Sequence, residues 1–170
     1  MGGYKVIGVL LAICLLAGCE DTSFQSSVPA YPVHVEIDTR MGDFVHFQPS
    51  VIGSYVVVDP TGYYYDGRFI RALSVTDHYG YAGVVVYVPI IPPSTGGEYC
   101  AHDMACPNCA KKQLRRQCQI DGMKAVCPEC NEQYDLSFGI GNPIQGISKE
   151  SMRPLQVLNQ GGKLTITQKR

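Results

Sequence analysis

Four cysteines in two short knuckles are the residues of this sequence best suited to chemistry. Cys106 and Cys109 form one Cys-Pro-x-Cys knuckle, Cys127 and Cys130 form a second, and seventeen residues lie between the two. In a C-x-x-C turn both sulfurs can face one point about 2.3 Å away, and two such turns complete the tetrahedron of a structural zinc site. Proline at the second position stiffens each turn. The spacing therefore predicts that the four thiolates share one metal centre.

Two further cysteines flank the first knuckle. A disulfide between Cys100 and Cys118 would close a loop of about nineteen residues and stabilise the fold by about 3 kcal/mol in the chain-entropy model. The alternative is that each is a small buried hydrophobic residue. Because an exported chain meets an oxidising compartment, two disulfides among the knuckle cysteines are the competing interpretation of the metal site.

The N-terminal segment indicates export. Residues 6–18 are uncharged and mostly apolar, and as a helix they would rise only about 20 Å, short of the roughly 30 Å hydrocarbon core of a bilayer. Leu16-Ala17-Gly18-Cys19 resembles the lipobox of bacterial lipoproteins. The resemblance implies a signal peptide over 1–18, whose removal discards Cys14. It also implies acylation of Cys19, detectable with palmitate, and a lipid anchor in a bacterial envelope membrane, on the periplasmic side or the cell surface.

The sequence around the cysteines predicts short strands, which must position them. Residues 19–32 are polar and contain spaced prolines, the composition of a lipidated N-terminus and linker. Residues 33–39 alternate apolar and polar side chains, residues 55–58 and 83–90 are apolar runs, and residues 155–158 and 164–167 flank two glycines as a hairpin. With 18 Gly and 11 Pro, long helices are not expected. We expect one mostly β domain over 33–170, with its metal-binding loops within 100–135.

The charge of the chain gives no sign of a nucleic-acid partner. Its formal net charge is −1, and its pI is near 6.4. The basic run 111–116 is interpreted as a solvated loop face between the knuckles, with an anion site as the alternative. Tyr63, Tyr64 and Tyr65 are interpreted as half-buried strand positions, with a binding face as the alternative.

The residues from Cys127 to Thr167 resemble the C-terminal half of a Rieske domain. That family has a Cys-Pro-x-His-Gly-x-x-Tyr/Phe-Asp loop, then a loop rich in Gly and Pro, then a closing hairpin. The resemblance implies a Rieske-like β-sandwich with a small metal-binding subdomain like that of rubredoxin or a zinc ribbon. It also implies a 2Fe-2S cluster, which the family binds through one Cys and one His from each of two loops. The matching positions are Cys127, Pro128, Tyr134, Asp135, Gly141, Pro143, Gly146, Pro154 and Leu155.

The sequence departs from the Rieske pattern at the ligands. Cys130 stands at the second-loop His position, and Asn131 replaces the usual glycine. If Cys106 is the first-loop ligand, Asn108 stands at the other His position and Cys109 follows it. Both imidazoles would then be replaced by thiols.

A literal Cys-x-His does exist at Cys100-Ala101-His102, which makes Cys100 and His102 alternative ligands. His102 is separated from Cys127 by 24 residues, longer than the family's usual interval, whereas Cys106 gives the expected one. We therefore favour Cys106, and interpret His102 as a loop residue before the knuckle.

Three metal centres remain open: zinc, a single iron, or a 2Fe-2S cluster with four cysteine ligands. The resemblance favours the cluster. Two extra thiolates, however, should lower its reduction potential toward the roughly −400 mV of all-cysteine ferredoxins, which suits an oxidising compartment poorly. The N-terminus also has no twin arginine, so the chain is expected to cross the membrane unfolded, without a preassembled cluster. These physical arguments favour a single zinc or iron.

No stretch of the sequence pairs a recognisable nucleophile with a base. Ser137 and Ser148 lack the glycine elbow of hydrolases, and no H-E-x-x-H motif is present. At most, therefore, an electron-transfer component is expected. The sequence predicts an envelope-anchored lipoprotein whose Rieske-like domain binds a metal centre through four cysteines, and electron transfer to an envelope protein partner is one role that such a centre could have. The alternative is a structural metal or interaction protein of the envelope without redox activity.

Overall fold

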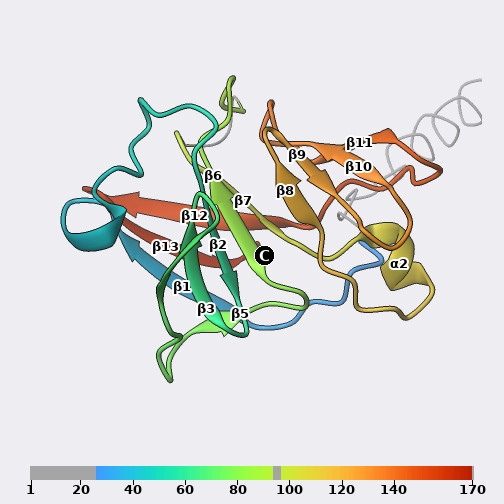
Figure 1. Cartoon of the computed structure of the whole chain (residues 1–170), viewed down its shortest axis with the longest axis horizontal. Helices are drawn as coiled ribbons and strands as arrows, with labels where there is room; N and C mark the ends of the chain where they lie inside the picture. The colour runs from blue at the N-terminus through green and yellow to red at the C-terminus, as the bar shows by residue number, and fades with distance from the viewer. Residues whose placement is uncertain (1–25, 94–96, 170) are drawn as a thin grey trace, which may run out of the picture.

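The computed structural model describes residues 26–93 and 97–169, and within them the chain is mostly β (Figure 1). One antiparallel sheet has the strand order β4-β3-β2-β6-β7-β12-β13-β1-β5, and a smaller one the order β11-β10-β9-β8. The larger sheet contains β1 (Val33–Asp38), β2 (Tyr55–Asp59), β3 (Gly62–Tyr65), β4 (Arg68–Arg71), β5 (His78–Tyr79), β6 (Val84–Tyr87), β7 (Cys100–Asp103), β12 (Pro154–Gln160) and β13 (Lys163–Gln168).

The smaller sheet follows the first cysteine knuckle. It contains β8 (Gln119–Asp121), β9 (Lys124–Val126), β10 (Gln133–Asp135) and β11 (Asn142–Gln145). The described residues also form a 3-10 helix, η1 (Gly42–Phe44), and one short α-helix, α2 (Pro107–Lys111). The prediction of a mostly β chain with a small cysteine-bearing subdomain is confirmed.

Alternating side chains build the main core. In β1, Val33, Val35 and Ile37 are buried and the residues between them are only partly so, as the period-two pattern predicts. β1 pairs with β13 in a register that sets Ile37 opposite Leu164. Strands from distant parts of the large sheet pack into this one apolar cluster, so the sheet curls over its core in the manner of a β-sandwich.

The closing hairpin was also predicted correctly. β12 and β13 pair as far as Gln160 opposite Lys163, and the two residues between them are Gly161 and Gly162. Both glycines have positive φ, 61° and 91°, which a two-residue turn of this kind requires. The tyrosine run occupies β3, where Tyr63 and Tyr65 are buried, so the strand interpretation is confirmed.

β6 links the main core to the cysteines. All four of its residues are buried, so it is covered on both faces. Val84 and Val86 belong to the main core, whereas Val85 and Tyr87 belong to a second apolar cluster that contains the cysteine knuckles. The metal-binding subdomain is therefore packed against the large sheet through this central strand.

The segment before β1 packs more closely than a linker would. Val28 is fully buried, and its carbonyl accepts a hydrogen bond from the Arg153 guanidinium at 2.9 Å. The described end of the expected linker is therefore part of the domain, because an apolar side chain and a buried carbonyl anchor it. Cys14, the signal peptide 1–18 and Cys19 lie outside the described residues. Within the described part of the chain, no helix has the length and apolar character needed to cross a bilayer.

Candidate metal centre

The first knuckle is built by the start of α2. Cys106 is the residue that precedes the helix, and Pro107 occupies its first turn, where a missing N–H costs nothing. The Ala110 N–H donates to the Cys106 carbonyl at 2.9 Å. Cys109 lies within the helix and is also buried. A single helical turn therefore brings the Cys106 and Cys109 side chains to the same side.

The second knuckle is a tight turn between β9 and β10. The Asn131 N–H donates to the Cys127 carbonyl at 2.9 Å, and the Cys127 N–H donates to the Glu132 carbonyl at 2.9 Å. Asn131 has a φ of 57°, in the left-handed region that Asn tolerates better than most residues. This conformation turns the chain back into β10 directly after Cys130.

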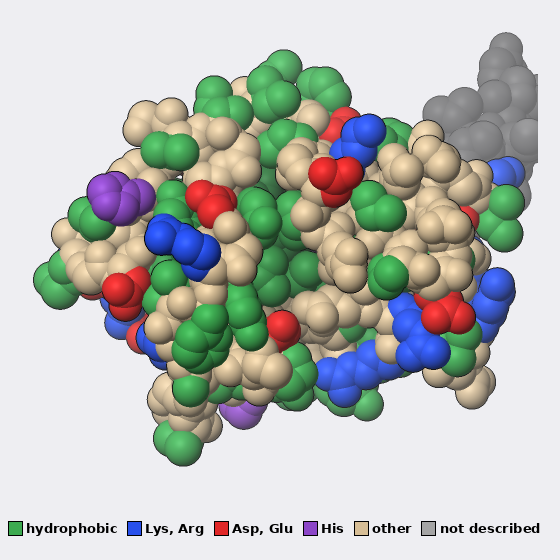
Figure 2. Space-filling view, in the orientation of Figure 1, with side chains coloured by type: hydrophobic (Ala, Val, Ile, Leu, Met, Phe, Trp, Pro, Cys, Tyr) green, Lys and Arg blue, Asp and Glu red, His purple; other side chains and the backbone are tan. Residues whose placement is uncertain are grey.

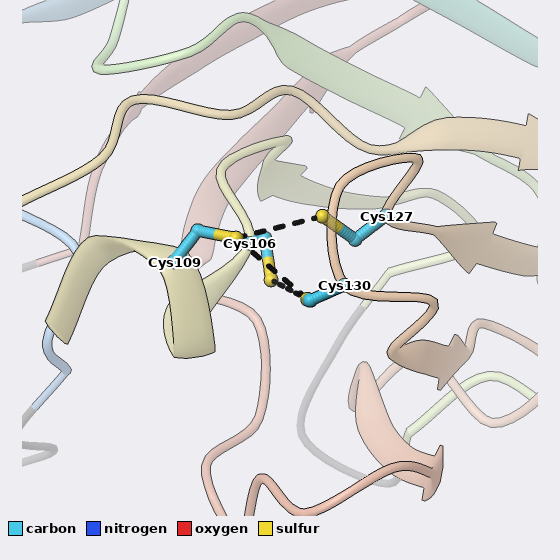
Figure 3. A group of neighbouring side chains, drawn as sticks. All are labelled: Cys106, Cys109, Cys127 and Cys130. Atoms are coloured by element: carbon cyan, nitrogen blue, oxygen red, sulfur yellow. Dashed lines mark hydrogen bonds between the residues drawn. The ribbon is translucent and has the colours of Figure 1, made fainter. Parts of the chain in front are cut away.

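The two knuckles bring four sulfurs together (Figure 3). The Sγ atoms of Cys106 and Cys130 are 3.6 Å apart, and Cys109 Sγ is 3.7 Å from both Cys127 Sγ and Cys130 Sγ. All four sulfurs lie within 4.8 Å of one another. Four ligands at about 2.3 Å from one ion are about 3.8 Å apart along each edge of a tetrahedron. The donor set and its spacing therefore fit one tetrahedral ion.

The electrostatics of the cluster favour one thiolate over several. The pKa of Cys106 is lowered to about 4 by the neighbouring Cys118 thiol, with smaller contributions from the Tyr134 hydroxyl and the Cys109 N–H. Burial raises the pKa of Cys109 above its usual range, and burial raises that of Cys127 to about 11. Four buried negative charges would repel one another strongly, so a cation is the group that would let all four thiols ionise.

The surroundings of the cluster are dry and apolar. Cys106 and Cys127 are fully buried, Cys109 nearly so, and Cys130 is partly exposed. The Tyr134 hydroxyl lies 3.5 Å from Cys106 Sγ, so it occupies the position of a donor to that sulfur. The remaining side chains of the shell include Val85, Tyr87, Met104, Ala125, Leu136 and Met152.

The alternative ligands Cys100 and His102 are outside the four-cysteine cluster. Both lie on β7, where Cys100 is opposite Tyr87. The two nitrogens of His102 are already used, Nδ1 by the Tyr87 hydroxyl at 3.2 Å and Nε2 by the Ile140 carbonyl at 3.1 Å. Burial lowers the pKa of His102 to about 4, so it is a neutral core imidazole. The expectation that His102 lies in a loop was wrong, because His102 lies on strand β7 and is buried.

Of the two interpretations of Cys100 and Cys118, the structure has the second: they form no disulfide, and both are free, buried thiols. Cys118 instead lies beside Cys106, whose pKa it lowers. The reason is a pairing of the chain around the first knuckle: the Cys118 N–H donates to the Met104 carbonyl at 2.8 Å, and Ala105 forms a bridge with Gln117. The influence of Cys118 on Cys106 was not predicted from the sequence, although Cys118 lies only nine residues after Cys109 of the first knuckle.

Glu132 is a second residue that the sequence did not point to. Its buried carboxylate accepts N–H bonds from Ile147 at 2.6 Å and Ser148 at 3.1 Å. A Cβ at Gly146 would meet that carboxylate at 2.2 Å, so only glycine fits there. Glu132 thereby ties the loop that carries Cys130 to the segment after β11.

Comparisons with known proteins found limited similarity. No family model and no curated protein matches this chain. A structure titled as a complex of reduced oxygenase and oxidized ferredoxin in carbazole 1,9a-dioxygenase is 13% identical over 81% of this chain and 96% of that one, with a TM-score of 0.43. The Sphingomonas yanoikuyae B1 ferredoxin is 16% identical over 59% of this chain and 84% of that one, with a TM-score of 0.36.

Proposed function

We propose that this chain is an envelope-anchored metal protein in which Cys106, Cys109, Cys127 and Cys130 bind a single zinc or iron ion. The observation that carries the proposal is the short distance between sulfurs of different knuckles, 3.6 Å from Cys106 to Cys130 and 3.7 Å from Cys109 to Cys127. Those distances are the edges of a tetrahedron around one ion.

The same distances argue against a 2Fe-2S cluster. Each iron of such a cluster takes two of the four thiolates, and the bridging sulfides lie between the two pairs. Sulfurs on different irons must then be further apart than one tetrahedron edge. In this structure every sulfur lies within 4.8 Å of the other three. The cluster remains the second candidate because of the Rieske-like residues around Cys127, Tyr134 and Asp135.

The identity of the ion decides between two functions. Iron would give the site one-electron chemistry, whereas zinc would stabilise the fold only. The structure supports a stabilising contribution in either case. The metal would join α2 to the small sheet at a site where Cys106 and Cys127 are fully buried. An electron carrier needs iron and a partner, and a structural protein needs neither.

Elemental analysis of protein purified from its own envelope tests the proposal. We expect one zinc or one iron per chain and no acid-labile sulfide. Cys106→Ser and Cys127→Ser should each lose the metal, whereas Cys100→Ala, at a thiol outside the cluster, should keep it. Full metal content in both Ser variants would contradict a shared site, and two irons with two sulfides would establish the cluster.

The anchor is a separate part of the proposal, supported by Leu16-Ala17-Gly18-Cys19. In the cell that makes this protein, palmitate should label the wild-type chain, and Cys19→Ala should remain unprocessed and unlabelled. Labelling of Cys19→Ala at the wild-type level would contradict the lipid anchor.

A further inference from the structure

The first described residues of the chain lie beside the basic loop. The backbone N–H and the hydroxyl of Ser27 both donate to the Glu150 carboxylate at 3.1 Å, and Val28 after it is fully buried. The Lys111 ammonium binds the same carboxylate at 3.0 Å. Glu150 therefore fixes the point where the chain enters the domain next to the C-terminal end of α2.

Residues 111–116 form an exposed basic surface at this end of the molecule. All six side chains are exposed, and Lys and Arg side chains gather over α2 and the loop that follows it (Figure 2). Two carboxylates pair with this surface, Glu150 with Lys111 and Glu129 with Arg116. Lys112 and Arg115 have no salt-bridge partner among the described residues, so the surface keeps a net positive charge. We name it the 111–116 surface.

An apolar side chain lies in the middle of the basic ones. Leu114 is 38% exposed, between Lys112 and Arg115. Arg115 lies 5.6 Å from the ring centroid of Tyr81, which holds it beside the domain. Basic side chains around an exposed apolar one are the combination that binds the headgroup region of an anionic bilayer.

The chain before Ser27 places a bilayer within reach. Six residues lie between Cys19 and Ser26, and even fully extended the chain from Cys19 to Ser26 spans only about 25 Å. If Cys19 carries the lipid, the 111–116 surface therefore stays close to the membrane that holds the acyl chains. We propose that this surface docks on the anionic phospholipid headgroups of that membrane, with Leu114 entering the interface. The inference rests on the proposed lipid anchor, and it fixes which end of the domain faces the bilayer.

A single introduced tryptophan tests the docking, because the chain has no native Trp. The acylated protein with Leu114→Trp would be reconstituted into vesicles of neutral phosphatidylcholine, with or without phosphatidylglycerol. We expect a blue-shifted emission that brominated lipid quenches only in the anionic vesicles, and reversal by high salt. Val75→Trp is the control, since Val75 is 99% exposed between β4 and β5. Equal emission of Leu114→Trp in both vesicle types would overturn the proposal.

Charge variants built in the Leu114→Trp background identify which basic side chains contribute to docking. Lys112→Gln with Arg115→Gln should weaken docking by about twenty-five-fold, at roughly fivefold for each basic side chain near an anionic surface. Lys124→Gln with Arg68→Gln removes the same charge from β9 and β4 and should leave docking unchanged. An equal loss in both pairs would mean general charge attraction and would overturn a specific surface.

Failure of the anchor and failure of the docking surface are distinguishable. Flotation with neutral vesicles and palmitate labelling report the anchor alone. If the Leu114→Trp protein floats with the vesicles but its emission is not blue-shifted, the lipid anchor stands and the docking proposal is refuted. If no acyl chain is found, the same fluorescence measurement with added vesicles still applies: a shift with anionic lipid alone supports the 111–116 surface, and no shift refutes it.

Discussion

The hydroxyl of Tyr134 lies 3.5 Å from the sulfur of Cys106, and both residues are fully buried. A buried thiolate needs hydrogen-bond donors, and at a fully buried sulfur neighbouring protein groups provide them. Tyr134 therefore belongs to the site in addition to the four ligands. It lies on β10, the strand that follows the second knuckle, and from there its hydroxyl donates to a sulfur of the first knuckle.

Tyr134→Phe should weaken the metal site without emptying it. The loss of one hydrogen bond to a charged sulfur should lower the free energy of unfolding by about 2 kcal/mol and speed metal transfer to a chelator. Urea unfolding and chelator competition measure the two effects. Tyr65→Phe is the matched control, because the Tyr65 hydroxyl donates to the His46 carbonyl at 3.2 Å, away from the cysteines. Wild-type chelator kinetics in Tyr134→Phe would contradict this role.

Asn131→Ala should destabilise the second knuckle. Asn131 has a φ of 57°. The free-energy cost of this conformation is about 1 kcal/mol higher for alanine than for glycine, and the cost for asparagine is intermediate. Asn131→Gly should therefore be as stable as wild type or more so, and should retain the metal. Thermal unfolding of the two variants measures the difference. Equal stability of the Ala and Gly variants would show that the backbone of this turn relaxes.

His102 should make the protein sensitive to mild acid. Its pKa is about 4 in the buried site, because burial disfavours the charged ring, against about 6.5 in an unfolded chain. Between these values the unfolded state binds more protons, so stability rises with pH in this window and is complete above about 6.5. Acidification through the window should cost about 3 kcal/mol from this group.

Urea unfolding at pH 7.5 and pH 5 checks the sign and the origin of this loss. His102→Gln should have a smaller difference between the two pH values, since it has no imidazole to protonate. His78→Gln, at an exposed histidine of β5, should keep the full difference. An unchanged difference in His102→Gln would assign the acid sensitivity to other groups.

Local patterns predicted the parts of the fold that depend on local sequence. The alternation in β1, the glycine turn before Lys163 and the two cysteine knuckles each follow from a few adjacent residues, and the structure has all three. The knuckles were readable because ligand spacing is itself a local constraint.

Features that depend on distant pairing could not be predicted in this way. Cys118 lies beside Cys106 because Ala105 pairs with Gln117. Val28 is buried because Ala82, Ala105 and Ala110, from distant parts of the chain, pack with it. Glu132 has no local sequence signal, because Gly146, which lies against its carboxylate, is fourteen residues further along the chain. In each case the partner lies beyond the reach of a short pattern.

X-ray absorption at the metal edge of the purified protein tests the central claim most directly, because it measures the number of ions as well as their ligands. A single ion held by Cys106, Cys109, Cys127 and Cys130 predicts one shell of four sulfurs at about 2.3 Å and no second metal nearby. An iron edge with iron–iron scattering would contradict the mononuclear site and establish the 2Fe-2S cluster in its place.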